Sequence, residues 1–283
     1  MEGAKGLRLE DLPLHFICFI GVTAQVLLLV AFVRNPLKCF RNSATYLVAN
    51  LSVSDTLFLI FGFAVSTQSS WYALGPIAGF IYATSYVSIF TMFSIAIDRY
   101  LMVVYPFKHR YLMSGKRSAV WIAFTWIMAL FFPAKNFIFG RTSQFDSQII
   151  TILALVITLA SGLAYTLTFL SLRNQARCLA AQENHSGNHS QGARVLKEKE
   201  FVKTIIIVCC VTMLTLPPFV IFSQVGLTQD PSSYNNKFNK ILRCILTTLF
   251  YCNFAVNPFI YIWRLPKYRK SIYLMLRCKN LNV

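Results

Sequence analysis

An acid, a base and an aromatic residue stand in a row at Asp98, Arg99 and Tyr100, directly after residues 75–97, which contain no charge. If that stretch crosses a membrane as a helix, the pair of Asp98 and Arg99 lies where the helix meets water. One turn deeper, each charge would cost about 2.5–3.5 kcal/mol. An ion pair at this boundary can stabilise one conformation and release another. The simpler interpretation is a charged flank that anchors the helix.

A second carboxylate, Asp55, lies in the middle of the apolar stretch of residues 44–66. Ionisable residues inside membrane segments usually mark functional sites. Ser88, Asn253 and Asn257 are the polar residues that could share its site, and together they would suit a small cation or a proton-linked switch. The alternative is a protonated, hydrogen-bonded carboxyl group with a structural role.

These residues need a membrane-embedded scaffold. The 283 residues are 56% hydrophobic and 13% charged, which is too apolar for one soluble core. A helix needs roughly 20 residues to cross a bilayer. Apolar segments occur at residues 12–33, 44–66, 75–97, 119–133, 149–172, 201–225 and 241–263, and the fourth is the shortest. The sequence predicts an all-α bundle of seven transmembrane helices, because backbone groups in lipid must be paired internally.

Basic residues predict the orientation. With the N-terminus outside, the inner segments hold 20 Lys and Arg, and the outer ones hold seven, with five acids. This positive-inside bias assigns residues 1–11 to an extracellular N-terminus, 12–263 to the bundle and 264–283 to an inner segment. The net charge of +17 then reflects topology and contact with membrane lipids, not nucleic acid. Residues 1–13 lack the pattern of a signal peptide, so the first span is expected to be an uncleaved anchor.

Six motifs fall in order along the chain and together resemble the rhodopsin-like G-protein-coupled receptors. They are residues 50–55 (NLSVSD), Asp98-Arg99-Tyr100, Pro106-Phe107, Trp126, the segment from Lys197-Glu198 to Pro218-Phe219, and residues 257–261 (NPFIY). The resemblance covers most of the chain, and each motif lies on the corresponding span.

The resemblance implies a receptor that converts binding of an extracellular ligand into activation of a heterotrimeric G protein at the plasma membrane. Arg99 would pair with Asp98 and Glu198 in the inactive state, and meet Tyr165 and Tyr261 in the active state, with Tyr100, Asn257 and Pro258 completing the switch motifs. Asp55, Ser88, Asn253 and Asn257 match a sodium pocket, the one cofactor expected. Arg99, Pro106 and Phe107 would contact the G protein.

The chain also departs from the family pattern. Gln25 replaces the first-span asparagine, Leu216 and Thr212 replace the sixth-span Trp and Phe, and Ile157 replaces the fifth-span proline. The cysteine pair that joins the third span to the second outer loop is absent. These changes put the usual aromatic relay in question, and some of them resemble the melanocortin and lysophospholipid receptors.

The sequence predicts a ligand pocket in the outer half of the bundle. Its expected lining follows helical spacing on three spans: Ile81, Ser85, Phe219, Phe222, Ser223, Arg243, Thr247 and Tyr251. Ile81 replaces the aspartate that family members use for monoamines, so an amine ligand is not expected. Arg243 could hold the carboxylate or phosphate of an anionic lipid-like or peptide ligand, or could extend to the lipid headgroups.

After the last span, residues 266–276 predict an amphipathic helix at the membrane surface, with Tyr268, Ile272, Tyr273 and Leu276 on its apolar side. Cys278 then becomes a candidate for palmitoylation, or is an ordinary thiol. A disulfide between Cys18 and Cys244 is conceivable if the first and last spans are neighbours, but pairing cannot be deduced from sequence.

Other functions fit less well. No group of residues provides a nucleophile with its base or a catalytic metal site, and all four His lie in or near loops or at a span edge, so no enzyme is expected. A light-driven protein would need a chromophore lysine where Tyr251 stands. A seven-helix transporter is the remaining alternative, although the chain shows no convincing internal repeat.

Overall fold

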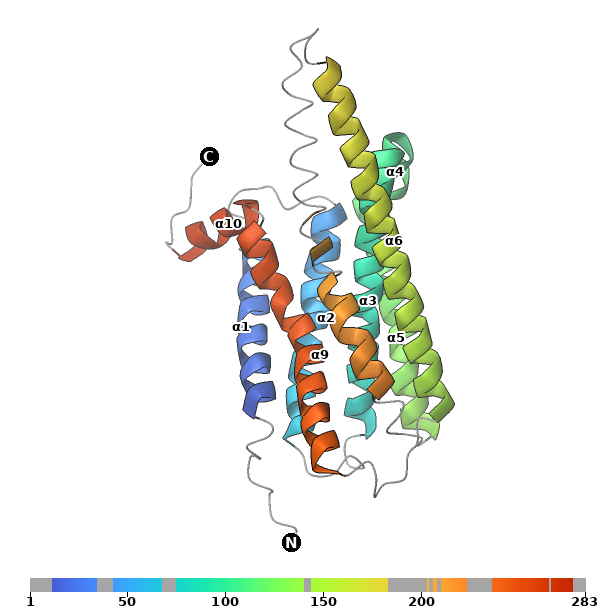
Figure 1. Ribbon diagram of the computed structural model, residues 1–283, viewed down its shortest axis with the longest axis vertical. Helices are drawn as coiled ribbons and strands as arrows, with labels where there is room; N and C mark the ends of the chain where they lie inside the picture. Colours follow the sequence, from blue (N-terminus) through green and yellow to red (C-terminus); the bar gives the residue numbers. More distant parts are fainter. Residues whose placement is uncertain are drawn as a thin grey trace.

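The computed structural model describes residues 12–34, 43–67, 75–139, 144–182, 203, 206–207, 210–222, 236–264 and 266–276. All regular elements in these ranges are helices, and they form one elongated bundle (Figure 1). The helices are α1 (Leu12–Arg34), α2 (Ser43–Ser66), α3 (Gly75–Val104), α4 (Pro106–Leu112), α5 (Gly115–Phe139), α6 (Gln144–Gln182), the helix Cys210–Phe222, α9 (Lys237–Arg264) and α10 (Pro266–Leu276).

A helix occupies each of the seven predicted apolar segments. Five helices in the described part of the chain, namely α1, α2, α3, α6 and α9, are long and apolar enough to cross a bilayer. The helix α5 has 25 residues, which at 1.5 Å per residue also exceeds the roughly 30 Å core. Its ends lie well outside the predicted segment 119–133. The helices on the third and fifth predicted segments, α3 and α6, also continue past their predicted ends, to Val104 and Gln182.

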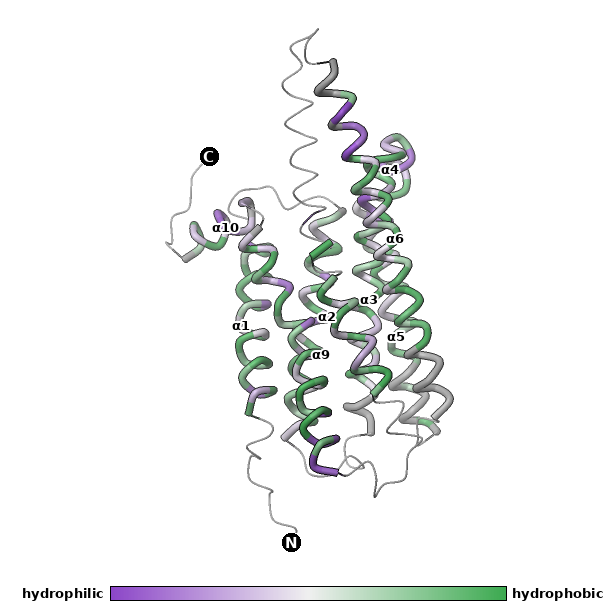
Figure 2. The backbone as a smooth tube through the Cα atoms, viewed as in Figure 1, coloured by the Kyte–Doolittle hydropathy of each residue, from purple (hydrophilic) through white to green (hydrophobic). Residues whose placement is uncertain are grey.

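Hydrophobic residues predominate along the middle of the long helices (Figure 2), and many of their large apolar side chains are exposed. In α1, Phe16, Phe19 and Val33 are exposed while Cys18 and Leu28 are buried. Exposed apolar surface of this extent would not be stable in water, but it matches a hydrocarbon solvent.

Small residues allow the helices to approach closely. A Cβ atom on Gly21 of α1 would lie 2.7 Å from both the Cβ of Ala255 in α9 and the Cδ1 of Leu59 in α2. A Cβ atom on Gly62 of α2 would collide with the ring of Tyr251 in α9. Glycine at these two positions therefore sets the spacing of α1, α2 and α9, as small residues commonly do between membrane helices.

Polar side chains fasten α3 between α2 and α5. The Nδ2 of Asn50 donates to the hydroxyl of Thr91 at 2.8 Å, and the indole Nε1 of Trp126 donates to Oδ1 of Asn50 at 2.9 Å. A second indole, that of Trp121, donates to the hydroxyl of Ser94 at 2.8 Å. These bonds fix the rotation of α3, and hence the direction in which Ser88 and Arg99 point.

The predicted surface helix is present as α10, which lies across the end of α9 (Figure 1). Tyr268 and Ile272 are buried, and the ring of Tyr268 meets Phe32 of α1 edge to face at 5.6 Å. The prediction was wrong for Tyr273, which is 49% exposed, because five residues from Tyr268 correspond to about 140° around a helix. Leu274 is buried instead.

Candidate functional site

The carboxylate of Asp55 lies at the centre of the bundle, where it is inaccessible to solvent. Ser88 of α3 donates to its Oδ1 at 2.7 Å, and Asn257 of α9 donates to its Oδ2 at 2.7 Å. Both residues were predicted to share the site. Gln25 of α1 donates to Oδ2 at 3.2 Å. Asp55 therefore connects its own helix α2 to three others through hydrogen bonds that are charge-assisted when its carboxyl group is ionised.

Gln25 also satisfies a backbone group that a proline leaves open. Pro258 lies inside α9 and has no N–H, so the carbonyl of Phe254, four residues earlier, lacks its helical donor. The Nε2 of Gln25 donates to that carbonyl oxygen at 3.0 Å. One amide thus connects Asp55 to the point where the hydrogen bonds of α9 are interrupted. From the sequence, Gln25 was known as a departure from the family pattern in the first span, and the groups that it contacts were not predicted.

Asn253, the fourth predicted member of the Asp55 site, takes a different partner. Its Oδ1 accepts a hydrogen bond from Thr212 of the helix Cys210–Phe222 at 2.8 Å. Thr212 and Asn253 border a small cavity of about 10 Å³, which is room for about one water molecule. The cavity is lined by Ser88, Ile89, Met92, Thr158, Ser161, Thr212, Asn253 and Asn257. Oxygen donors of this kind suit a hard cation.

The predicted ion pair between Asp98 and Arg99 forms, and both side chains are buried. Arg99 Nη2 lies 2.9 Å from Asp98 Oδ2, and both residues are buried within α3, which continues beyond them to Val104. Arg99 also donates from Nη1 to the sulfur of Met102 at 3.6 Å. The predicted second partner, Glu198, lies outside the described residues.

His109 is a member of this site that the sequence did not reveal. Its Nε2 lies 3.0 Å from Asp98 Oδ1, so Asp98 contacts Arg99 with one oxygen and His109 with the other. His109 belongs to α4, which begins with Pro106 at a position where the missing N–H costs nothing. The sequence offered no signal beyond a histidine 11 residues after Asp98, because the contact depends on how α4 folds back.

The two tyrosines of the predicted switch, Tyr165 and Tyr261, are both buried. Tyr165 donates from its hydroxyl to the carbonyl oxygen of Met92 at 2.9 Å. Tyr261 is fully buried, its ring lies 6.1 Å from that of Tyr268, and its hydroxyl has no hydrogen-bond partner among the described residues. Both tyrosines belong to one apolar cluster, which includes Leu47, Leu51, Met92 and Ile95. The remaining switch residue, Tyr100, meets Tyr105 edge to face at 6.2 Å.

Phe107, the second residue of α4, is 91% exposed. Its neighbour Pro106 is also exposed. The helix α4 lies at the same end of the bundle as α10 (Figure 1).

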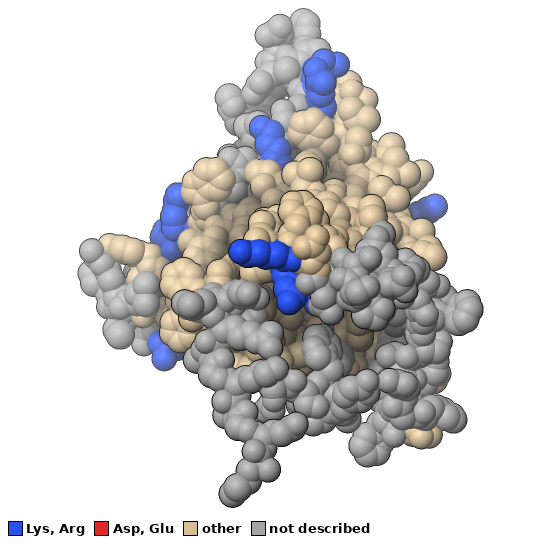
Figure 3. Space-filling model, turned by 60° about the horizontal axis from the view of Figure 1, so that its bottom comes forward, with Lys and Arg blue, Asp and Glu red and all other residues tan. Residues whose placement is uncertain are grey.

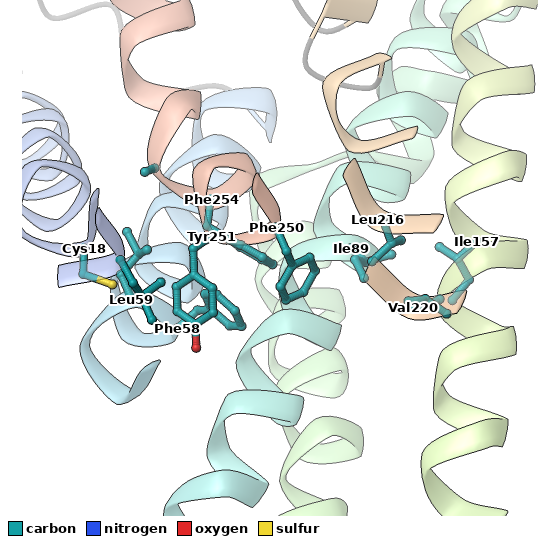
Figure 4. Packing of buried hydrophobic residues seen from close by; sticks show 13 residues of the cluster. Cys18, Phe58, Leu59, Ile89, Ile157, Leu216, Val220, Phe250, Tyr251 and Phe254 are labelled. Carbon is teal, nitrogen blue, oxygen red and sulfur yellow. The ribbon is translucent and has the colours of Figure 1, made fainter. Parts of the chain in front are cut away.

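In the half of the bundle nearer the start of α9, Tyr251 and Phe219 of the predicted pocket pack against other aromatic rings. Tyr251 is buried beside Phe58, with the ring centres 4.9 Å apart, and its ring covers Gly62. Phe219 stacks on Phe250 at 4.3 Å with the planes nearly parallel. Figure 4 shows Phe58, Phe250, Tyr251 and Phe254 in one layer. The sequence did not identify Phe58 and Phe250 as members of this layer. Most residues of a membrane span are apolar, so the sequence pattern does not show which of them contact each other.

The other predicted pocket residues are less enclosed. Ile81, Ser85, Phe222 and Thr247 are half-buried, and the hydroxyl of Ser85 donates to the carbonyl of Tyr82 in its own helix at 2.9 Å. Ser223 and the lipidation candidate Cys278 lie outside the described residues. Cys18 is buried in α1, and no disulfide joins it to Cys244 in the described structure.

The first turns of α9 carry basic residues. Lys237, Lys240 and Arg243 recur every three residues and all are exposed. The end of the bundle at which α9 begins shows Lys and Arg among uncharged side chains, and no described acidic side chain is visible there (Figure 3). This end is opposite to the one with α4 and α10 (Figure 1).

Comparison with known proteins gives a family for this arrangement. The profile described as "7 transmembrane receptor (rhodopsin family)" matches residues 24–261. The chain is 22% identical to galanin receptor 2a of Danio rerio, over 95% of the chain and 78% of that receptor. It is 23% identical to a QRFP-like peptide receptor of Branchiostoma floridae, over 98% of the chain and 80% of the relative.

A lipid receptor also matches: lysophosphatidic acid receptor 4 of Homo sapiens is 24% identical, over 90% of the chain and 76% of the relative. These matches give no support to a transporter. With a helix on each of seven apolar segments, a buried Asp55 at its centre and the family profile over most of its length, the chain belongs to the rhodopsin family of seven-transmembrane, G-protein-coupled receptors.

Proposed function

We propose that this receptor recognises an extracellular ligand that combines an anionic group with an apolar body, as lysophospholipids and acidic peptides do. The basic outer turns of α9 supply the charge. Arg243 can contact a carboxylate or phosphate with two parallel hydrogen bonds, and Lys237 and Lys240 add positive potential beside it. Relatives named for a lysophospholipid and for peptides agree with either version of this ligand.

The apolar body of the ligand would lie deeper in the bundle than Arg243. Thr247 and Tyr251 follow Arg243 at intervals of four residues and so share its face of α9. Phe219 and Phe250 stack next to this face, with Ile81, Ser85, Phe222 and Ser223 as further candidates for the lining. The observation that carries the proposal is this succession, on one helix face, from exposed cations to a buried aromatic layer.

The switch we propose is an exchange of partners by Arg99. The arrangement in which Arg99 contacts Asp98 is the inactive one, with Glu198 as the second candidate partner. On activation Arg99 would leave Asp98 and meet Tyr165 and Tyr261, which belong to one buried apolar cluster. A ligand drives such an exchange only by binding the released arrangement more tightly.

Asp55 would transmit the change between the two ends. It joins α1, α2, α3 and α9, and through Gln25 it reaches the carbonyl that Pro258 leaves without a donor. A sodium ion next to Asp55, Ser88, Asn253 and Asn257 would favour the inactive packing. The donor oxygens and the neighbouring cavity of about 10 Å³ fit an ion of that size.

The receptor would present α4 and α10 to the cytosol and its N-terminus to the exterior of the plasma membrane. The excess of Lys and Arg in the segments on the α4 side supports this orientation. There, Arg99, Pro106 and the exposed Phe107 would contact a heterotrimeric G protein. Palmitate on Cys278 would hold the far end of α10 on the membrane.

The test is a ligand screen in cells that express the chain, read through sensors for several heterotrimeric G proteins. Lysophosphatidic acid and a set of acidic peptides serve as anionic probes, and monoacylglycerol serves as the uncharged match. We expect an anionic probe to cause G-protein dissociation and the uncharged lipid to cause none. Equal responses to charged and uncharged lipids would refute the anionic ligand.

A further inference from the structure

The carboxylate of Asp98 is shared between two side chains that carry or can acquire a positive charge. Arg99 Nη2 lies 2.9 Å from one oxygen and His109 Nε2 lies 3.0 Å from the other. Since a carboxylate oxygen only accepts, Nε2 is the donor in the second contact. Asp98 is fully buried, whereas the side chain of His109 is 19% exposed and so can exchange protons with solvent.

His109 fastens α4 to α3. The chain turns from α3 into α4 at Tyr105, whose N–H donates to the carbonyl of Leu101 at 2.9 Å, and the N–H of His109 then donates to the carbonyl of Tyr105 at 2.9 Å. The side-chain contact with Asp98 adds a link across 11 residues. Phe107, two residues before His109, is thereby presented to solvent on a helix of fixed orientation.

We propose that His109 is a positioning residue of the Arg99 switch and makes the switch sensitive to protons, with protonation of His109 favouring release of Arg99 from Asp98. This inference rests on the proposed exchange of partners by Arg99. It adds a residue outside the transmembrane helices that decides how strongly Asp98 retains Arg99.

The direction of this proton effect follows from the charges around Asp98. Imidazole is the side chain whose charge most readily changes within the range of pH that cells reach. While Arg99 contacts Asp98, a proton on His109 would place two cations against one carboxylate, and like charges oppose protonation. Once Arg99 has left, the imidazolium has the carboxylate to itself. His109 therefore binds a proton more tightly in the released arrangement, and by linkage acidification shifts the receptor toward it.

The other charged groups shown near α4 are all basic. Lys108 lies over the ring of Tyr105 at 5.1 Å. From α5, Arg117 covers the ring of Tyr111 at 4.0 Å and donates to the carbonyl of the same residue. Lys116 is exposed at the start of α5. Among the acidic side chains that the structure describes, Asp98 alone contacts α4, so it is the carboxylate that a proton on His109 would affect.

The first experiment needs no G protein. The full chain, with labelled histidine, is placed in lipid nanodiscs and titrated by NMR between pH 5.5 and 8, with the His109 signal identified by its loss in His109→Gln. We expect the titration midpoint of His109 to be measurably higher in Arg99→Gln than in the unaltered chain, because one cation has been removed. Arg117→Gln is the matched control and should leave the midpoint in place. Equal midpoints in the unaltered chain and Arg99→Gln would overturn the inference.

The second experiment measures nucleotide exchange on purified heterotrimers of the inhibitory, stimulatory and phospholipase-activating classes, from pH 6.0 to 7.8. We expect basal exchange by the unaltered receptor to increase severalfold on acidification. His109→Gln keeps a donor without a titrating ring, and should show little pH dependence.

A slope that persists in His109→Gln would contradict the role of His109. Should that variant fail to accumulate, His109→Tyr retains a donor and makes the same comparison. If no heterotrimer responds at any pH while the NMR midpoints differ as expected, G-protein coupling fails as the function but the linkage between His109 and Arg99 holds.

Discussion

Gln25 donates a hydrogen bond of 3.0 Å from its side-chain amide to the backbone carbonyl oxygen of Phe254, a residue of α9 that is 229 positions away in sequence. That carbonyl lacks a helical donor because residue 258 is a proline. In a bilayer no water is present to supply another donor to this carbonyl. Loss of the bond to Gln25 should therefore destabilise the fold more than loss of an exposed bond. The same amide nitrogen also contacts Asp55 at 3.2 Å.

Replacing Gln25 by leucine should therefore lower stability. The change keeps the side-chain size but leaves the Phe254 carbonyl, and one bond to Asp55, without a donor. We expect a loss of about 1–3 kcal/mol, seen as a lower midpoint of thermal unfolding in detergent. Gln25→Glu, which keeps the length but removes the amide donor, should behave similarly. A midpoint equal to that of the unaltered chain in both variants would contradict the role of this bond.

Gly62→Ala should be destabilising because the new methyl group would meet the ring of Tyr251. Overpacking of this kind typically costs about 1–3 kcal/mol. Gly115→Ala is the matched control, since its Cβ would lie at an ordinary 3.6 Å from Tyr46. Thermal unfolding of both variants provides the measurement. Combining Gly62→Ala with Tyr251→Ala should recover part of the loss, and a purely additive double variant would exclude the clash as the cause.

Asp55→Asn should remove a stabilising effect of sodium. If the ion binds the folded receptor next to Asp55, sodium chloride raises the unfolding temperature of the unaltered chain by mass action. Potassium chloride at the same ionic strength is the control. The variant, with a neutral amide in place of the carboxylate, should unfold at the same temperature in both salts. A sodium effect of unchanged size in Asp55→Asn would place the ion elsewhere.

Arg99→Ala should abolish nucleotide exchange on the G protein while the receptor still reaches the cell surface. Removal of the guanidinium leaves no group to exchange partners between Asp98 and the tyrosines Tyr165 and Tyr261. Surface labelling and an exchange assay on the same cells give the two readouts. Normal signalling by this variant would refute the switch.

Arg243→Gln should weaken the response to an anionic ligand about tenfold or more, as expected for loss of a charge-assisted hydrogen bond. An uncharged analogue of the same ligand should lose much less. Lys237→Gln, six residues nearer the start of α9, serves as the control for a general change of surface charge. Equal losses for charged and uncharged ligands would mean that Arg243 extends to the lipid headgroups instead.

The sequence alone determined the bundle and the inward position of its polar residues. Seven apolar segments have few stable arrangements in lipid, and a carboxylate such as Asp55 must face other helices. Its contacts with Ser88 and Asn257 were therefore predictable, and so was the pairing of the adjacent Asp98 and Arg99.

The tertiary structure decided which partners the other polar groups take. Helical spacing states which face a residue occupies, but it does not state how far one helix is shifted or rotated against the next. Asn253 bonds to Thr212, Gln25 reaches the Phe254 carbonyl, and His109 reaches Asp98 only because α4 folds back on α3. Each of these contacts depends on a relative placement of two elements, and that placement is set by packing over the whole bundle.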